Sequence, residues 1–254
     1  MTDFKDFLPI ISGAIGGATA SGVLNGPIQT LEDWWYVKFG YKASNQAALL
    51  KAKQEANVEK LKRDILNEVD QIPIENFQEP RLKILGPALD ASRYYIEEEE
   101  LRMMFAKIIA SSLDNRKNNI VHSSFVEIIK QLDVLDAKLL SYFKKNHYGP
   151  QTSIPVMKVE TDLHYGKVTI LQLVYLSQEF ENFQQNAISL TNLERLGIIT
   201  FKKDRFITDD SVYSFIRNSG TITHLLMSHP EMELGKYCFS ITDFGQSFIE
   251  ACVI

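Results

Sequence analysis

The spacing of apolar residues changes near Gly149-Pro150, and this change constrains the fold more than any other feature of the sequence. Before it, apolar residues recur at steps of three and four, as on one face of an α-helix. After it, short apolar runs and alternating stretches such as Tyr237, Phe239 and Ile241 are typical of half-buried strands. We therefore expect a mainly α chain of the α+β class, with helices first and a small antiparallel sheet later.

The first predicted helix covers residues 44–72, with Ser44 as its N-cap. Its apolar stripe consists of Val58, Leu61, Ile65, Val69 and Ile72. Gly86-Pro87 is expected to open the next helix, because proline is tolerated at the first helical position. The first part of the chain therefore predicts a helical bundle.

Four glutamates, residues 97–100, begin a further predicted helix that runs to about residue 113. Adjacent residues point around a helix, so we expect a solvated first turn here and not a metal site. Residues 124–127 have the pattern of a capping box, and Asp133 is the expected N-cap of the helix after it. His122 is expected to fix the turn between helices through a backbone hydrogen bond; a binding or catalytic role is the alternative.

The second half predicts a different arrangement. Residues 186–196 form a predicted helix, and Gly197 followed by an apolar residue is typical of a Schellman motif. Residues 199–201 and 205–207 are expected to pair across a polar turn, and Thr242 to cap the last helix.

This order of elements is that of a winged helix, with residues 208–235 as an insertion in the wing. The runs 157–159 and 168–176 fit strand or helix equally. We therefore expect three parts: a glycine-rich N-terminal segment (1–43), a helical domain (44–120) and a winged-helix-like domain with an insertion (121–254).

Residues 7–31 carry no charge and contain five glycines. The spacing of Gly13 with Gly17, and of Gly22 with Gly26, allows close contact between helices. We expect a tightly packed helix or helical hairpin; a membrane-active segment with Trp34 and Trp35 at the interface is the alternative. The candidate residues for membrane or oligomer contact are Gly13, Gly17, Gly22, Gly26, Trp34 and Trp35.

The chain has a formal net charge of −5, which disfavours nucleic acid and anionic lipid as partners. Its two cysteines, Cys238 and Cys252, form no disulfide or metal-ligand pattern and are expected to be buried thiols. The first six residues are a poor signal-peptide start. We therefore expect a cytoplasmic protein, with membrane association as the alternative.

The sequence shows no phosphate-binding loop, nucleophile elbow or metal-ligand spacing. We expect no enzymatic activity and no cofactor. If the winged-helix half binds DNA, the candidate contacts are Asn192, Arg195, Lys202, Lys203 and Arg205. These are fewer basic residues than specific DNA binders usually bring to the phosphates.

Three stretches together resemble the abortive infection alpha (Abi-alpha) family. They are GPALDASRYYIEEEELRMMFAKIIASSLD (86–114), VHSSFVEIIKQLDVLDAKLL (121–140) and ITDFGQSFIEAC (241–252). The resemblance extends over about residues 80–254. The chain departs from the family pattern at Ser123, where relatives tend to have proline, and at Asp133-Val134, where they tend to have Ser-Pro. Both are helix starts, so one cap chemistry replaces another.

The resemblance implies a bacterial protein associated with defence against phage, and it supplies no catalytic residues. Three hypotheses follow. The first is a non-enzymatic effector or sensor whose residues 7–36 act on membranes or form a homo-oligomer. The second is a module that binds a phage or host protein through the winged-helix half. The third is a DNA-binding regulator.

Overall fold

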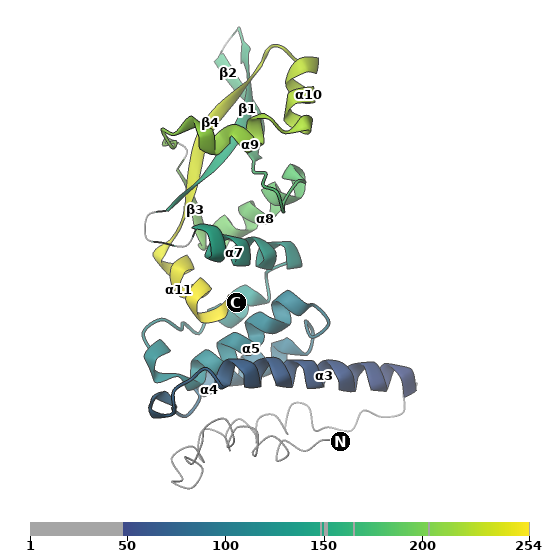
Figure 1. The fold of residues 1–254 in the computed structure, drawn as a ribbon, viewed down its shortest axis with the longest axis vertical. Coiled ribbons are helices and arrows are strands. Elements are labelled where there is room, and N and C mark those ends of the chain that lie inside the picture. The colour runs from purple at the N-terminus through teal and green to yellow at the C-terminus, as the bar shows by residue number, and fades with distance from the viewer. Residues whose placement is uncertain (1–47, 148, 150–151, 165, 203, 254) are drawn as a thin grey trace. The chain divides into compact units, whose positions relative to one another are not determined.

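A computed structural model describes residues 48–147, 149, 152–164, 166–202 and 204–253, with side chains from Ala56 onward. It forms two compact units (Figure 1). Unit 1 comprises the chain up to Ala137 together with residues 247–254, and unit 2 comprises residues 138–246. Unit 1 continues past the predicted boundary at residue 120 and includes the last residues of the chain.

Unit 1 is a helical assembly around one buried helix. Its helices are α3 (Ala48–Val69), α4 (Leu82–Ser92), α5 (Glu99–Leu113) and α6 (Phe125–Ile129), with short 3-10 turns η3 (Ile74–Asn76) and η4 (Asn115–Lys117). Helix α5 contacts α3, α4 and α6, and eleven of its residues are buried. The predicted stripe of α3 is confirmed, because Leu61, Ile65 and Val69 lie in the core. Ser44 lies outside the described residues.

The start of α4 differs from the prediction. The helix begins at Leu82, so Pro87 lies inside it and not at its first position. Proline removes one backbone donor, but it sits on the exposed side of this short helix, and Ile84 and Leu85 bury the opposite side. Burial of the apolar side therefore determines where the helix begins, and the proline is accommodated.

The run of four glutamates lies only partly in α5. The helix begins at Glu99, and the side chains of Glu97, Glu98 and Glu99 are exposed. Arg102 is buried and forms an ion pair with Asp64 of α3 at 2.7 Å. This pair links the two longest helices of unit 1.

The capping box predicted at residues 124–127 is not formed. Ser124 precedes α6 without a side-chain cap bond, and its hydroxyl lies 2.7 Å from Nδ1 of His122. The backbone N–H of Ser124 also donates to this nitrogen. His122 therefore fixes the turn before α6, as predicted. Its hydrogen bond with the Ser124 hydroxyl occupies the group that would have capped the helix.

The end of the chain completes unit 1. The hydroxyl of Ser111 donates to the carbonyl of Ala251 at 2.9 Å, and the ammonium of Lys107 donates to the carbonyl of Val253 at 2.7 Å. Phe248 packs edge-on against Phe125 at 5.3 Å between ring centroids. These bonds satisfy carbonyls that every helix leaves unpaired in its last turn, and a lysine there also suits the helix dipole.

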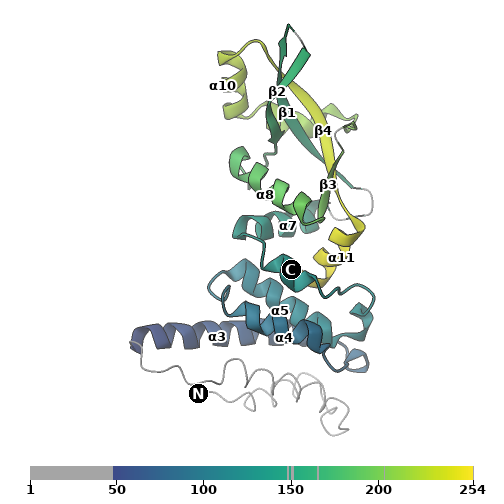
Figure 2. The ribbon, with the colours of Figure 1, turned by 180° about the vertical axis from the view of Figure 1, so that it is seen from behind.

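Unit 2 is built around a four-stranded antiparallel sheet in the order β2-β1-β4-β3 (Figure 2). The strands are β1 (Ser153–Leu163), β2 (Gly166–Val174), β3 (Ile199–Lys202) and β4 (Met232–Ile241). The helices are α7 (Val134–His147), α8 (Phe183–Arg195), α9 (Ser214–Arg217), α10 (Gly220–Ser228) and α11 (Asp243–Cys252), with a 3-10 turn η5 (Asp210–Tyr213). Helices α7 and α11 cross the division between the units.

One face of the sheet is contacted by α7 through aromatic rings. Phe239 of β4 lies 5.4 Å from Phe143 of α7 and 5.7 Å from Phe201 of β3, measured between ring centroids. Tyr175, which follows β2, lies 5.8 Å from Phe143. Edge-to-face contacts of this kind add to the stabilisation from burial alone.

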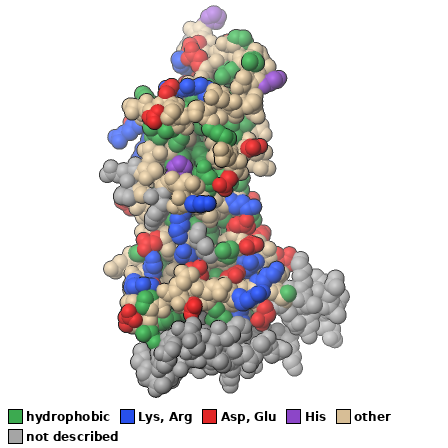
Figure 3. Space-filling view, in the orientation of Figure 1, with side chains coloured by type: hydrophobic (Ala, Val, Ile, Leu, Met, Phe, Trp, Pro, Cys, Tyr) green, Lys and Arg blue, Asp and Glu red, His purple; other side chains and the backbone are tan. Residues whose placement is uncertain are grey.

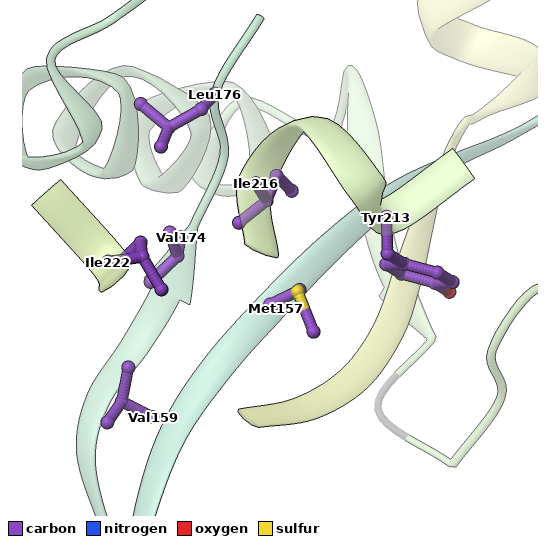
Figure 4. Close-up of a cluster of buried hydrophobic side chains, with 7 residues drawn as sticks. All are labelled: Met157, Val159, Val174, Leu176, Tyr213, Ile216 and Ile222. Atoms are coloured by element: carbon purple, nitrogen blue, oxygen red, sulfur yellow. The ribbon is translucent and has the colours of Figure 1, made fainter. Parts of the chain in front are cut away.

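The other face is covered by the segment between β3 and β4. Met157, Val159 and Val174 of the sheet meet Tyr213, Ile216 and Ile222 of the covering segment in one buried cluster (Figure 4). The segment that the sequence analysis set aside as an insertion is therefore part of the core of unit 2.

The predicted hairpin of residues 199–201 with 205–207 is wrong. Strand β3 pairs with β4 instead, from Ile199 opposite Ile241 to Lys202 opposite Cys238. Residues 205–207 form no strand, and the sulfur of Cys238 lies 3.7 Å from the carbonyl of Arg205. Strand β3 pairs with β4 because the alternating apolar residues of β4 offer better cross-strand partners. Both cysteines are buried, as predicted.

The predicted Schellman motif at the end of α8 is confirmed. Gly197 has a φ of 75°, its N–H donates to Glu194, and the N–H of Ile198 donates to Leu193. Helix α11 begins on this turn. The hydroxyl of Thr242 caps the helix by accepting from the N–H of Gly245 and donates to the carbonyl of Gly197 at 2.6 Å.

Gly245 is required by this contact. A Cβ atom there would lie 2.0 Å from the carbonyl oxygen of Ile198. We expect Gly245→Ala to lower the free energy of unfolding by about 2–3 kcal/mol, because the obstructing atom belongs to backbone and cannot rotate away. Urea unfolding followed by circular dichroism measures the change.

Gly220→Ala is the matched control, because an added Cβ at Gly220 meets nothing within 4 Å. We expect it to change stability by roughly 0.5 kcal/mol, in the stabilising direction. Equal losses in both variants would show that the contact with Ile198 does not matter.

Candidate functional site

The predicted membrane or oligomer contacts lie outside the described residues. They are Gly13, Gly17, Gly22, Gly26, Trp34 and Trp35. From residue 48 to residue 253, the described helices include none that is long and apolar enough to cross a membrane.

The predicted nucleic-acid contacts lie near one another, on α8 and β3. Arg195 uses part of its guanidinium within α8, donating to the Asn192 side chain at 2.7 Å. Lys202 ends β3 and Arg205 follows in the loop, while Lys203 lies outside the described residues.

A carboxylate lies among these basic residues. The Glu194 side chain accepts the backbone N–H of Phe201 at 3.2 Å. Glu194 precedes Arg195 in the chain, and Phe201 precedes Lys202. Negative charge at this position opposes a phosphate backbone. The positions of these side chains therefore add nothing in favour of nucleic-acid binding to what their residue types already suggest.

The covering segment between β3 and β4 carries the most unusual surface of unit 2. Phe206, Val212 and Phe215 are exposed by 57%, 37% and 43%. Figure 3 shows hydrophobic side chains at the surface over α9 and α10, with charged groups beside them. We call Phe206, Val212 and Phe215, with the charged Asp210, Arg217 and Lys236, the insertion surface.

Two ion pairs order the charged part of this surface. Asp210 accepts from Lys236 of β4 and from Arg217 of α9, the latter at 3.2 Å. The hydrogen bond from Lys236 holds the pKa of Asp210 below its ordinary value. The ammonium of Lys236 also lies 6.0 Å from the centre of the Phe206 ring, within the range of a cation–π contact.

Tyr213 anchors the insertion surface to the sheet. Its side chain is fully buried, its hydroxyl accepts from the N–H of Ile207 at 2.9 Å, and it donates to the carbonyl of Tyr237 at 3.1 Å. Burial raises the pKa of Tyr213, so the hydroxyl keeps its proton at neutral pH. The Tyr213 side chain, on η5, is therefore hydrogen-bonded both to the loop at Ile207 and to β4 at Tyr237.

Sequence reasoning missed the insertion surface. Val212, Tyr213, Phe215 and Ile216 are all apolar or aromatic, and nothing in their spacing separates the buried pair from the exposed pair. Only the contact of Tyr213 and Ile216 with the sheet decides that Val212 and Phe215 face solvent. The available signal was the presence of large apolar residues in a segment otherwise rich in polar ones.

These features define a class: a protein of two units, one helical and one built on a small curled antiparallel sheet that is covered by helices and by an apolar, exposed insertion. The chain belongs to the abortive infection alpha family, whose model matches residues 53–252. No curated protein matches it, and no solved structure matches it.

The anchoring role of Tyr213 can be tested directly. We expect Tyr213→Phe to lower the free energy of unfolding by about 1–3 kcal/mol, because a part-buried N–H and a buried carbonyl lose their partner. Amide exchange across residues 207–217 should increase in the same variant. Tyr94→Phe, at a tyrosine that is 76% exposed, is the control and should leave both measurements unchanged. If exchange across residues 207–217 stays at the wild-type rate, Tyr213 does not anchor the segment.

Proposed function

We propose that this chain is a non-enzymatic recognition protein of abortive infection, and that it binds a phage or host protein through the insertion surface. The family supports the biological context. The observation that carries the proposal is the exposure of Phe206, Val212 and Phe215 beside ordered ion pairs.

Such a surface suits a protein partner better than a nucleic acid. Aromatic side chains form the energetic centre of many protein interfaces, and a rim of ordered charges adds specificity. Asp210 also places a carboxylate between Lys236 and Arg217, which reduces their attraction for phosphate. A protein partner would bury the rings of Phe206 and Phe215.

The winged-helix interpretation is part of this proposal. Helix α8 would be the recognition helix, and the antiparallel β3 and β4 would be the wing. The predicted insertion, residues 208–235, would then lie within the wing. Its last residues belong to β4, and Tyr213 holds it on the sheet. Winged helices serve as protein-interaction modules as well as DNA binders, so the fold alone does not choose between them.

The insertion surface can be tested without disturbing the core. We expect the double variant Phe206→Ser with Phe215→Ser to lose protection against phage while the protein stays folded, because these residues are already exposed by 57% and 43%. Efficiency of plating on cells that express each variant measures the protection. Tyr94→Ser, which removes an exposed ring from unit 1, is the matched control and should protect like wild type. Full protection by the double variant would rule out this surface.

The N-terminal hypothesis concerns residues that the structure does not describe. We propose that residues 7–36 supply a membrane-active or self-associating effector function, on the strength of the uncharged stretch 7–31 and its glycine spacing. A chain that begins at Ser44 should then remain in the soluble fraction and fail to arrest growth, while the full chain sediments with membranes or self-associates and arrests growth. Equal behaviour of the two chains in membrane fractionation and growth assays would contradict this function and leave the insertion surface as the effector.

A further inference from the structure

Lys236 of β4 lies on the face of the sheet that the segment between β3 and β4 covers. It pairs with Met157 across the β1–β4 ladder, and side chains of cross-strand partners lie on the same face. Met157 belongs to the buried cluster of this face (Figure 4), and Leu234, two residues before Lys236, packs against that cluster. A lysine in a row of apolar side chains needs polar or aromatic partners for its charge.

Three groups of the covering segment surround the Lys236 ammonium. It donates to the Asp210 carboxylate, and it lies 6.0 Å from the centre of the Phe206 ring and 5.9 Å from that of the Tyr213 ring. Both distances are within the range of a cation–π contact. The Lys236 side chain is 30% exposed, so water screens these interactions less than it would at a fully exposed site.

Asp210 is held by a second cation. Its carboxylate also accepts a hydrogen bond from the Arg217 guanidinium at 3.2 Å. Two donors on one carboxylate constrain its orientation. The Lys236 ammonium is therefore directed to one place, beside the two rings.

The backbone around Phe206 is fixed on both sides, whereas its ring is not enclosed. The carbonyl of Arg205 lies 3.7 Å from the sulfur of Cys238, and the N–H of Ile207 donates to the Tyr213 hydroxyl at 2.9 Å. Residues 205–207 lie in neither a helix nor a strand, and Phe206 is 57% exposed. An exposed ring on such a loop can rotate about its side-chain bonds, and a cation beside it favours the rotamers that keep the ring close.

We propose that Lys236 is the positioning residue of the insertion surface, and that its charge fixes the orientation of the Phe206 ring that a protein partner covers. A ring ordered in advance loses less conformational entropy on binding, so Lys236 raises affinity without touching the partner. Val212 and Phe215 lie within η5 and α9, so the role of Lys236 is specific to Phe206. The inference rests on the proposed function, but the order of the ring can be measured without a partner.

Aromatic 13C relaxation of the full chain measures this order, with the Phe206 signal assigned by its loss in Phe206→Leu. We expect faster ring motion in Lys236→Met, which keeps the apolar stem and removes the charge, and the same change in the uncharged Lys236→Gln. Lys236→Arg keeps a cation beside the ring and should retain the wild-type motion. Wild-type ring motion in both uncharged variants, with circular dichroism showing them folded, would overturn the proposal.

Lys158→Met is the matched control. Lys158 is a sheet lysine of similar exposure, 34%, and it forms an ion pair with Glu160 at 2.6 Å. It follows Met157 in β1 and so lies on the opposite face from Lys236. The motion of the Phe206 ring should not change in this variant. Equal changes in Lys158→Met and Lys236→Met would show a general effect of losing a lysine from the sheet, and would also overturn the proposal.

Phage plating connects the order of the ring to recognition. Lys236→Met should raise the efficiency of plating by about tenfold, while Lys236→Arg and Lys158→Met protect like wild type. Full protection by Lys236→Met, with protection lost in the Phe206→Ser and Phe215→Ser double variant, would contradict the positioning role and leave the proposed function standing. Full protection by both would contradict the proposed function, and with it the role of Lys236 in recognition.

Discussion

The carbonyl of Ile198 is the point on which the second unit depends. It ends the Schellman turn after α8, and it accepts hydrogen bonds from the backbone N–H of Thr242 at 3.0 Å and from the hydroxyl of that residue at 3.2 Å. Gly245 allows the first turn of α11 to approach this carbonyl closely. The contact fixes where β4 ends and where α11 begins, and so sets the register of β4 against β3. The last residues of α11 then complete unit 1 through Lys107 and Ser111.

Both edges of the sheet are protected, so recognition in unit 2 is left to helices and loops. Strand β3 has four residues, and β2 is interrupted by two register shifts against β1 that re-aim its backbone. At one shift, the hydroxyl of Tyr237 donates to the carbonyl of Gln172, which satisfies a group that the ladder leaves unpaired. Exposed apolar residues lie on η5, α8, α9 and α10, and the sheet adds Leu163 of β1 and Ile170 of β2.

The insertion surface proposed for this abortive infection protein is aromatic and is bordered by ion pairs around Asp210. That combination suits a partner of different sequence, because the apolar centre is buried on binding while the charges add specificity.

The sequence by itself determined the local structure. The stripe of α3, the glycine end of α8, the threonine cap of α11 and the turn at His122 all depend on residues close together in the chain, and each is found in the structure. There are two exceptions. Pro87 lies inside α4 because burial of Ile84 and Leu85 decides where that helix begins, and Ser124 does not cap α6 because its hydroxyl is bonded to His122. The family could also be predicted from the sequence, because its motifs are short stretches of neighbouring residues.

The tertiary structure alone decided which segments meet. Residues 199–202 pair with β4 and not with the nearer 205–207, because the apolar alternation of β4 offers better cross-strand partners. The insertion surface could not be predicted, because burial of Tyr213 and exposure of Phe215 follow from a sheet face formed by residues some fifty positions earlier in the chain. Periodicity reports on neighbours along a helix or strand, whereas exposure of a short segment is set by the distant surface that it covers.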